Sequence, residues 1–217
     1  MNAREEILQR IRTALRDIPP HETPHDVPIP RDYLDAHVPD DPHTLAELLA
    51  QNLTDYRATV HHSGTQQLPH TIAQLLTRHG STSVAIPTDL PPTWLTALPD
   101  TIQVTPDNPA LTPHDLDQID TVITGCALAI AETGTLILDT GPTQGRRALT
   151  LIPDHHIAII HAPHQIVASL PHALPRLHPT RPQTWISGPS ATSDIELSRV
   201  EGVHGPRHLD VIITTDV

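Results

Sequence analysis

Apolar residues recur along the chain with two spacings, one typical of helices and one typical of strands. Near the start they lie three to four positions apart among charged residues, which predicts an amphipathic helix over residues 2–16. The next segment, residues 18–42, is rich in Pro, His and Asp with little periodic apolar content, as in an extended linker. We therefore predict an N-terminal helix and Pro-rich linker over residues 1–42, followed by one α/β domain over residues 43–217.

Helical and strand-like segments alternate through the first part of this domain. We expect helices near residues 43–54, 66–79, 92–97 and 113–118, and strands at 56–62, 81–87 and 101–105. Such alternation indicates βαβ units and a parallel sheet.

Apolar segments with short connections follow, and these add antiparallel pairs to the parallel part. They are residues 120–125, 126–132, 135–140 and 156–161, before helices at 164–177 and 194–201 and strands at 184–188 and 209–214. The predicted fold is α/β, a three-layer α/β/α sandwich with a mixed, mostly parallel sheet.

Charge and composition exclude several classes of function. The formal net charge of −12, without a block of basic residues, disfavours nucleic acid and membrane surfaces as partners. All 13 basic residues are arginines, so the chain has no amine for a Schiff base, a P-loop lysine or a pyridoxal phosphate anchor. Aromatic residues make up only 2% of the chain, so Leu, Ile, Val and Ala must fill the core.

The cysteine and histidine content limits which cofactors this chain can hold. The single Cys126 excludes an intramolecular disulfide and a Cys-ligated iron–sulfur cluster within this chain. The 17 histidines are scattered, and neither His155-His156 nor His161-x-x-His164 completes a familiar metal set, so we predict no metal and expect most histidines at the surface. The charged N-terminal stretch has no apolar signal region, which predicts a cytoplasmic protein.

Glu132 is the first candidate for chemistry, because it lies at a turn between two apolar strands. Ligands of open α/β sheets bind outside the carboxyl ends of the strands, so Glu132 could act as a base, a nucleophile or a substrate-orienting group. The alternative is that Thr133 and Gly134 form a tight hairpin and leave Glu132 solvated.

A loop at residues 141–147 ends in Arg146 and Arg147, whose guanidinium groups suit bidentate contact with a carboxylate or phosphate. The alternative is a surface loop whose arginines pair with Asp139 or Asp154.

The stretch over residues 186–206 combines hydroxyls, glycines and charges. A loop at 188–192 leads into an S-x-x-E capping box formed by Ser193 and Glu196, and a helix start of this kind offers N–H donors to an anion. Alternatively, Asp194 occupies those donors itself and the passage is only a capped helix.

Residues 125–160 and 186–213 together closely resemble the lactate utilization protein C family, the LutC/YkgG type of LUD domain. The resemblance implies a fold similar to the NagB/RpiA/CoA-transferase group. It also implies a role in oxidising L-lactate to pyruvate with two iron–sulfur partner proteins. Because this chain has one cysteine, the clusters are expected on the partners and an accessory role is expected here.

The resemblance further implies which residues matter. Glu132 is the candidate catalytic residue. The residues implied in ligand binding match the family's AETGT turn, its basic loop, and its SGPSxTxDIE and EGVHGP stretches. They are Thr133, Gly134, Thr135, Arg147, Ser187, Gly188, Ser190, Thr192, Ser193, Asp194, Glu196, Glu201 and His204.

Two main hypotheses follow. The first is a non-catalytic or ligand-sensing subunit of a lactate-oxidising assembly. The second is a free-standing enzyme of the CoA-transferase or sugar-phosphate-isomerase type, acting on an anionic small molecule with Glu132 as base or nucleophile and Arg147 as anion clamp. The second requires Glu132 and the 187–194 loop to share one crevice. A purely structural domain, with the hydroxyl-rich loop explained by capping alone, ranks below both.

Overall fold

The computed structural model describes residues 2–19, 21, 23, 26, 29–190 and 205–215, which form two units, Met1–Leu34 and Asp35–Val217. The first unit contains the predicted N-terminal helix, α1 (Ala3–Ala14). Asn2 and Glu5 begin it with a capping box, in which each side chain accepts a hydrogen bond from the other's backbone N–H.

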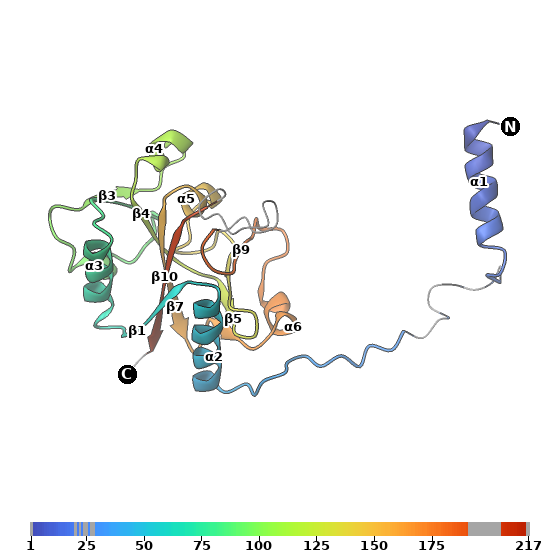
Figure 1. Ribbon diagram of the computed structural model, residues 1–217, viewed down its shortest axis with the longest axis horizontal. Coiled ribbons are helices and arrows are strands. Elements are labelled where there is room, and N and C mark those ends of the chain that lie inside the picture. Colours follow the sequence, from blue (N-terminus) through green and yellow to red (C-terminus); the bar gives the residue numbers. More distant parts are fainter. Residues whose placement is uncertain are drawn as a thin grey trace. The chain divides into compact units, whose positions relative to one another are not determined.

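A sheet of six parallel strands forms the centre of the second unit, in the order β1-β10-β7-β4-β2-β3 (Figure 1). Its middle strands are runs of β-branched and small apolar residues, which suit strands buried on both faces. The strands are β1 (Thr59–Gly64), β2 (Ser83–Ile86), β3 (Gln103–Pro106), β4 (Thr121–Gly125), β7 (His155–Ala162) and β10 (His208–Thr215).

The antiparallel pairs lie in a separate sheet of four strands, ordered β8-β5-β6-β9. The strands are β5 (Leu128–Ile130), β6 (Thr135–Leu138), β8 (Ile166–Val167) and β9 (Thr184–Ile186). We expected one mixed sheet, but the antiparallel pairs form a second sheet. Strands β5 and β6 pair antiparallel because their connection is too short for a parallel crossover.

Two layers cover the faces of the central sheet (Figure 1). On one face lie α3 (Leu68–Arg78) and η1 (Pro92–Leu95), packed on apolar residues of β4, β7 and β10. On the other face lie α2 (Pro42–Asp55) and the second sheet, whose shared core is aliphatic as the composition predicts. The predicted α/β fold class is confirmed, and the narrower likeness to the NagB/RpiA group stays a prediction.

The remaining helices are short. They are α4 (Pro113–Asp117), α5 (Arg147–Leu151), α6 (Leu170–Ala173) and η2 (Leu174–Arg176). The continuous helix predicted over residues 164–177 was wrong, since β8, α6 and η2 occupy that range. Pro171 and Pro175 lack the N–H groups that a long helix needs, which explains the break.

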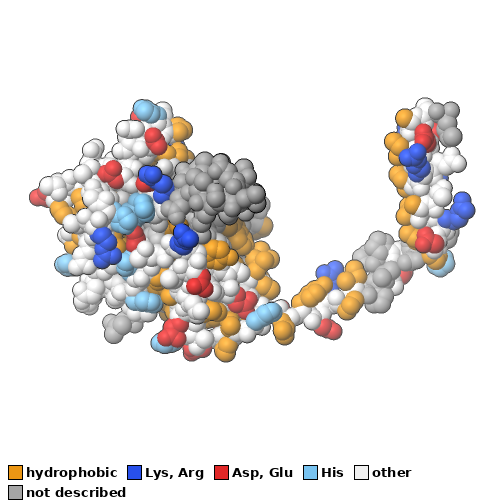
Figure 2. Space-filling view, viewed as in Figure 1, with side chains coloured by type: hydrophobic (Ala, Val, Ile, Leu, Met, Phe, Trp, Pro, Cys, Tyr) orange, Lys and Arg blue, Asp and Glu red, His pale blue; other side chains and the backbone are white. Residues whose placement is uncertain are grey.

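Surface charges are interspersed on the face shown in Figure 2, where arginines alternate with acidic side chains instead of forming one basic patch. In the described part of the chain, none of the helices combines the length and apolar character needed to cross a membrane.

Asp120 ties the start of β4 to the start of β2. Its Oδ2 accepts hydrogen bonds from the backbone and hydroxyl groups of Thr82 and Ser83, over 2.7 to 3.0 Å. Partial burial would raise the pKa of Asp120, but these hydrogen bonds outweigh burial and lower the pKa below its ordinary value. The ionised carboxylate therefore stabilises the fold.

We predict that Asp120→Ala lowers the free energy of unfolding at pH 7 by about 1 to 2 kcal/mol, a range reduced because the side chain is partly solvated. Since the folded-state pKa is depressed, this contribution is complete above the unfolded pKa of about 3.9 and shrinks as pH falls below it. Denaturant unfolding at pH 7 and pH 3 measures both. Asp100→Ala, on an exposed turn, is the control, and equal losses in the two variants contradict the prediction.

Candidate functional site

Two of the stretches singled out in the sequence meet in the second sheet. Strand β6 pairs with β9 in a register that sets Leu136 opposite Ile186, so the residues flanking that pair are neighbours. The hydroxyls form a chain, in which Thr133 Oγ1 lies 2.8 Å from Thr135 Oγ1 and Thr135 Oγ1 lies 2.8 Å from Ser187 Oγ. The structure therefore brings the AETGT turn and the SGPS stretch together.

Both stretches bend at glycines that press against the end of α2. Gly134 has φ +57° and Gly188 has φ +81°, in the left-handed region that favours glycine. A Cβ on Gly134 would come 2.9 Å from Asn52 C, and a Cβ on Gly188 would come 2.4 Å from Tyr56 O. The end of α2 can approach the two turns this closely because neither carries a side chain.

The carboxylate of Glu132 is held by the segment that precedes α2. Its Oε1 accepts the backbone N–H of His37 at 2.5 Å, and Asn52 Nδ2 donates to the carbonyl oxygens of Ala131 and Glu132. The tight hairpin at Thr133 and Gly134 is present, as the alternative interpretation expected, but Glu132 is half-buried and hydrogen-bonded, not simply solvated.

A pocket of about 200 Å³ opens beside the SGPS stretch. Its walls come from residues 184–190, from the end of α5, and from Gly205 and Pro206 of the HGP motif. The Ser190 N–H donates to the Pro206 carbonyl at 2.8 Å, which joins the two motifs. Glu132 is not among the lining residues, so the structure does not bring its carboxylate into this pocket.

The floor of the pocket lies at the amino ends of two central strands, through His156 of β7 and Leu209 of β10, which are register partners. We expected a ligand crevice at the carboxyl ends of the strands, where open α/β sheets usually bind ligands. The pocket lies elsewhere because the second sheet crosses this face and supplies the opposite wall.

His156 lines the pocket and carries a buried ring nitrogen that has no hydrogen-bond partner among the described residues. The side chain is buried, Nε2 lies 2.8 Å from Thr124 Oγ1, and Nδ1 has no hydrogen-bond partner among the described residues. Thr124 is also buried, and its hydroxyl has no other acceptor in the described structure, so it donates to Nε2 and the ring proton resides on Nδ1.

Burial lowers the pKa of His156 to about 3, with a smaller contribution from the neighbouring His155, so the ring is neutral near pH 7. A neutral Nδ1–H group facing a pocket is a hydrogen-bond donor that needs an acceptor. We expected most histidines at the surface, and among the described histidines His155 and His156 are the buried ones. They begin the buried strand HHIAIIHA, whose unbroken apolar run was the available signal.

Arg147 is a basic residue on α5, the helix whose end lines the pocket. It is exposed, begins α5, and makes no ion pair with any described residue, whereas Arg146 is paired with Asp107 at 2.8 Å. Thr150 and Leu151 line the pocket, three and four residues later, and therefore share a face of α5 with Arg147.

The ion pairs suggested for the arginine loop do not form. Asp139 and Asp154 are each paired with another arginine, Arg181 and Arg207 respectively. Among the described residues, the guanidinium of Arg147 therefore has no ion-pair partner.

Six predicted site residues lie outside the part of the chain that the structure describes, together with the helix expected over residues 194–201. They are Thr192, Ser193, Asp194, Glu196, Glu201 and His204.

Cys126 is buried, and its Sγ lies 3.8 Å from Gln165 Oε1. Burial raises the pKa of the thiol to about 12, so it stays protonated and does not provide a thiolate ligand near neutral pH.

A sequence model of the LUD domain matches residues 46–214, most of the chain. The chain belongs to the LUD domain family. A curated relative, "Lactate utilization protein C" of Deinococcus radiodurans, is 46% identical over 179 residues, which cover 79% of this chain and 82% of the relative.

Two further LUD relatives carry the same name. Those of Geobacillus sp. WCH70 and Halalkalibacterium halodurans are each 34% identical over 108 residues, and the match covers 44% and 46% of their respective lengths. Among solved structures, a DUF162 family protein from D. radiodurans is similar with a TM-score of 0.68 and 35% identity, covering 81% of this chain and 99% of that one. The fold of this chain is therefore shared with a solved structure.

For this LUD domain we predict that Gly188→Ala lowers the free energy of unfolding by more than Gly80→Ala. Both glycines have positive φ, so each substitution costs roughly 1 kcal/mol in backbone strain. Only at Gly188 does the added Cβ also meet backbone, because nothing lies within 4 Å at Gly80. Denaturant unfolding compares them, and equal losses contradict the close packing against α2.

Proposed function

We propose that this LUD domain protein acts in lactate utilization, as an accessory component of an iron–sulfur-dependent system that oxidises L-lactate to pyruvate. The relatives named lactate utilization protein C support the process. The geometric observation that carries the proposal is the unpartnered Nδ1–H of His156, a residue that lines the pocket walled by the SGPS and HGP stretches.

The pocket suits a small carboxylate. A volume of about 200 Å³ accommodates a short organic acid, and L-lactate and pyruvate each have three carbons and one carboxylate. The Nδ1–H of His156 donates to a carboxylate oxygen, and the positive charge of Arg147 on the same side of α5 attracts the anion. The hydroxyls of Ser187 and Ser190 supply further polar groups on the wall.

The accessory role follows from the redox chemistry. Oxidation of L-lactate to pyruvate releases two electrons and two protons, so an electron acceptor is required. The one cysteine of this chain is a buried, protonated thiol and cannot hold a cluster. We therefore assign the acceptor to iron–sulfur partner proteins.

The geometry gives less support to a free-standing enzyme with Glu132 as base. The carboxylate accepts the His37 N–H, and it does not line the pocket that holds the unpartnered donor. A general base must lie within hydrogen-bond reach of the proton that it removes.

We predict that the tagged chain, purified anaerobically from its own cells, co-elutes with two iron–sulfur proteins in stoichiometric amounts. Mass spectrometry identifies them, and their visible absorption reports intact clusters. The same purification from cells carrying the tag alone is the control. A chain that elutes alone contradicts the accessory role.

We also predict that His156→Gln weakens binding of pyruvate or L-lactate about tenfold or more, the loss expected for a hydrogen bond to a charged group. Gln carries its amide near the Nε2 position and keeps the Thr124 contact, while Asn carries its amide near Nδ1 and preserves the donor. His156→Asn should therefore bind more tightly than His156→Gln.

Isothermal titration calorimetry on the purified chain measures both variants, after denaturant unfolding has shown that they fold. Arg78→Gln, at the exposed end of α3, is the control for unspecific charge effects. If the Gln and Asn variants bind pyruvate and L-lactate as well as the unmodified chain does, His156 is not a ligand contact.

A further inference from the structure

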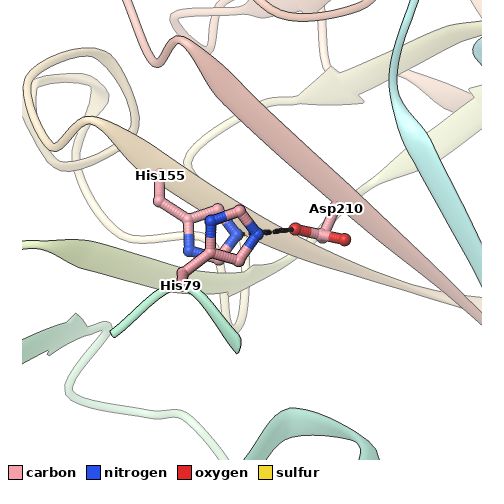
Figure 3. Close-up of side chains that lie close together, drawn as sticks. All are labelled: His79, His155 and Asp210. Carbon is pink, nitrogen blue, oxygen red and sulfur yellow. Dashed lines mark hydrogen bonds and ion pairs between the residues drawn. The ribbon is translucent and has the colours of Figure 1, made fainter. Parts of the chain in front are cut away.

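A second polar cluster surrounds the carboxylate of Asp210 (Figure 3). It lies on the opposite face of the central sheet from the pocket, because His155 and His156 are successive residues of β7. His79 Nε2 and His155 Nε2 lie 2.9 and 2.8 Å from Asp210 Oδ2, and His61 Nε2 lies 2.5 Å from Oδ1. The rings of His79 and His155 stack, with centroids 3.8 Å apart.

The fold assembles this cluster from four separate segments. His155 begins β7, and Asp210 lies near the start of β10. The parallel register places Asp210 two positions beyond the partner of His155, so both side chains point to the same face of the sheet. His61 comes from β1 on the other side of β10, and His79 ends α3, the helix that covers this face. The partners are up to 149 residues apart, so local spacing could not reveal them.

The chemistry around Asp210 is unusual for a buried carboxylate. Its side chain is 3% exposed, and among the described residues its hydrogen-bond and ion-pair partners are imidazoles, with no arginine. A buried carboxylate is normally compensated by a cation. Two imidazole nitrogens and a carboxylate oxygen, all within 4.8 Å of one another, are instead a donor set that suits a divalent transition metal.

We propose that His79, His155 and Asp210 bind a divalent transition metal of the Zn²⁺ type, with a further coordination position open to water. The two histidines would coordinate through Nε2 after losing that proton, and Asp210 through Oδ2. Zinc sites that keep an open position commonly use three protein ligands of this kind.

Neighbouring side chains hold these ligands in place through hydrogen bonds, as the outer shell of a metal site does. Thr121 Oγ1 lies 3.0 Å from His155 Nδ1 and 2.7 Å from Ser81 Oγ, which fixes the ring of His155 with Nε2 toward the carboxylate. His61 holds the other carboxylate oxygen. Such hydrogen bonds set the tautomer and direction of metal ligands.

The site is reachable from solvent, and metal binding requires both imidazoles to move. The His79 side chain is 26% exposed, so an ion can enter from solvent beside it. Tetrahedral bonds of about 2.1 Å place neighbouring ligand atoms about 3.4 Å apart. Both imidazole nitrogens, now 2.8 and 2.9 Å from Asp210 Oδ2, therefore move outward by about half an ångström, and the stacked rings turn toward the ion.

The proposal is tested by calorimetric titration of Zn²⁺ into the chelator-treated full chain. We expect one tight equivalent, and a loss of affinity of at least about tenfold in His79→Gln. His62→Gln is the matched control, because His62 is the next residue of β1 after His61, is exposed, and has no hydrogen bond to Asp210. No stoichiometric binding, or equal binding in the two variants, overturns the proposal, since the carboxylate then only accepts imidazole N–H groups.

A second variant, which gains a spectroscopic signal on metal binding, distinguishes a lost ligand from a folding defect in His79→Gln. His79→Cys replaces one ligand by a thiol, so Co²⁺ added to this variant should produce a thiolate-to-metal charge-transfer band that the unmodified chain lacks. Cys126 is buried and protonated and does not contribute. A Co²⁺ complex without that band overturns the assignment of His79. Neither readout depends on lactate chemistry, so failure here is distinct from failure of the proposed function.

Discussion

The alternation of side chains along β7 and β10 is the constraint on which the rest of the structure depends. Successive residues of a strand point to opposite faces of the sheet, and these two parallel strands run side by side through the core. His156 and Leu209 therefore face the second sheet and the pocket, whereas His155 and Asp210 face α3. The adjacent residues His155 and His156 of β7 thus belong to two separate polar sites on opposite faces of the sheet.

The second layer gives the pocket its wall. The turns at Gly134 and Gly188 pack on the end of α2, and the hydroxyl chain from Thr133 through Thr135 to Ser187 links them. Because α2 also packs on the central sheet, the wall and the floor are fixed by one helix. This arrangement explains why hydroxyl and glycine residues recur in stretches that otherwise carry few obvious catalytic groups.

The two polar sites differ in the ligands that they suit. The pocket offers a neutral imidazole N–H, serine hydroxyls and a nearby guanidinium, which together suit an anion. The Asp210 cluster offers lone pairs on imidazole and carboxylate, which suit a cation. The two sites of this LUD protein therefore suit ligands of opposite charge.

The sequence by itself determined the fold class, most helices and strands, and the aliphatic core, because helical and strand periodicities are local properties. It also predicted that the turn near Gly134 and the stretch near Ser187 matter, through their resemblance to one family. At residues 164–177 the prolines break the helix that we expected there.

Only the tertiary structure decided which of these residues meet. It places Glu132 outside the pocket lining and leaves Arg147 without the suggested ion pairs. It also brings His79 within hydrogen-bond distance of Asp210, 131 residues later in the sequence. The physical reason is that a parallel sheet joins distant segments by register. Which face a histidine points to, and whether its second nitrogen finds a partner, depends on strand neighbours that no local pattern specifies.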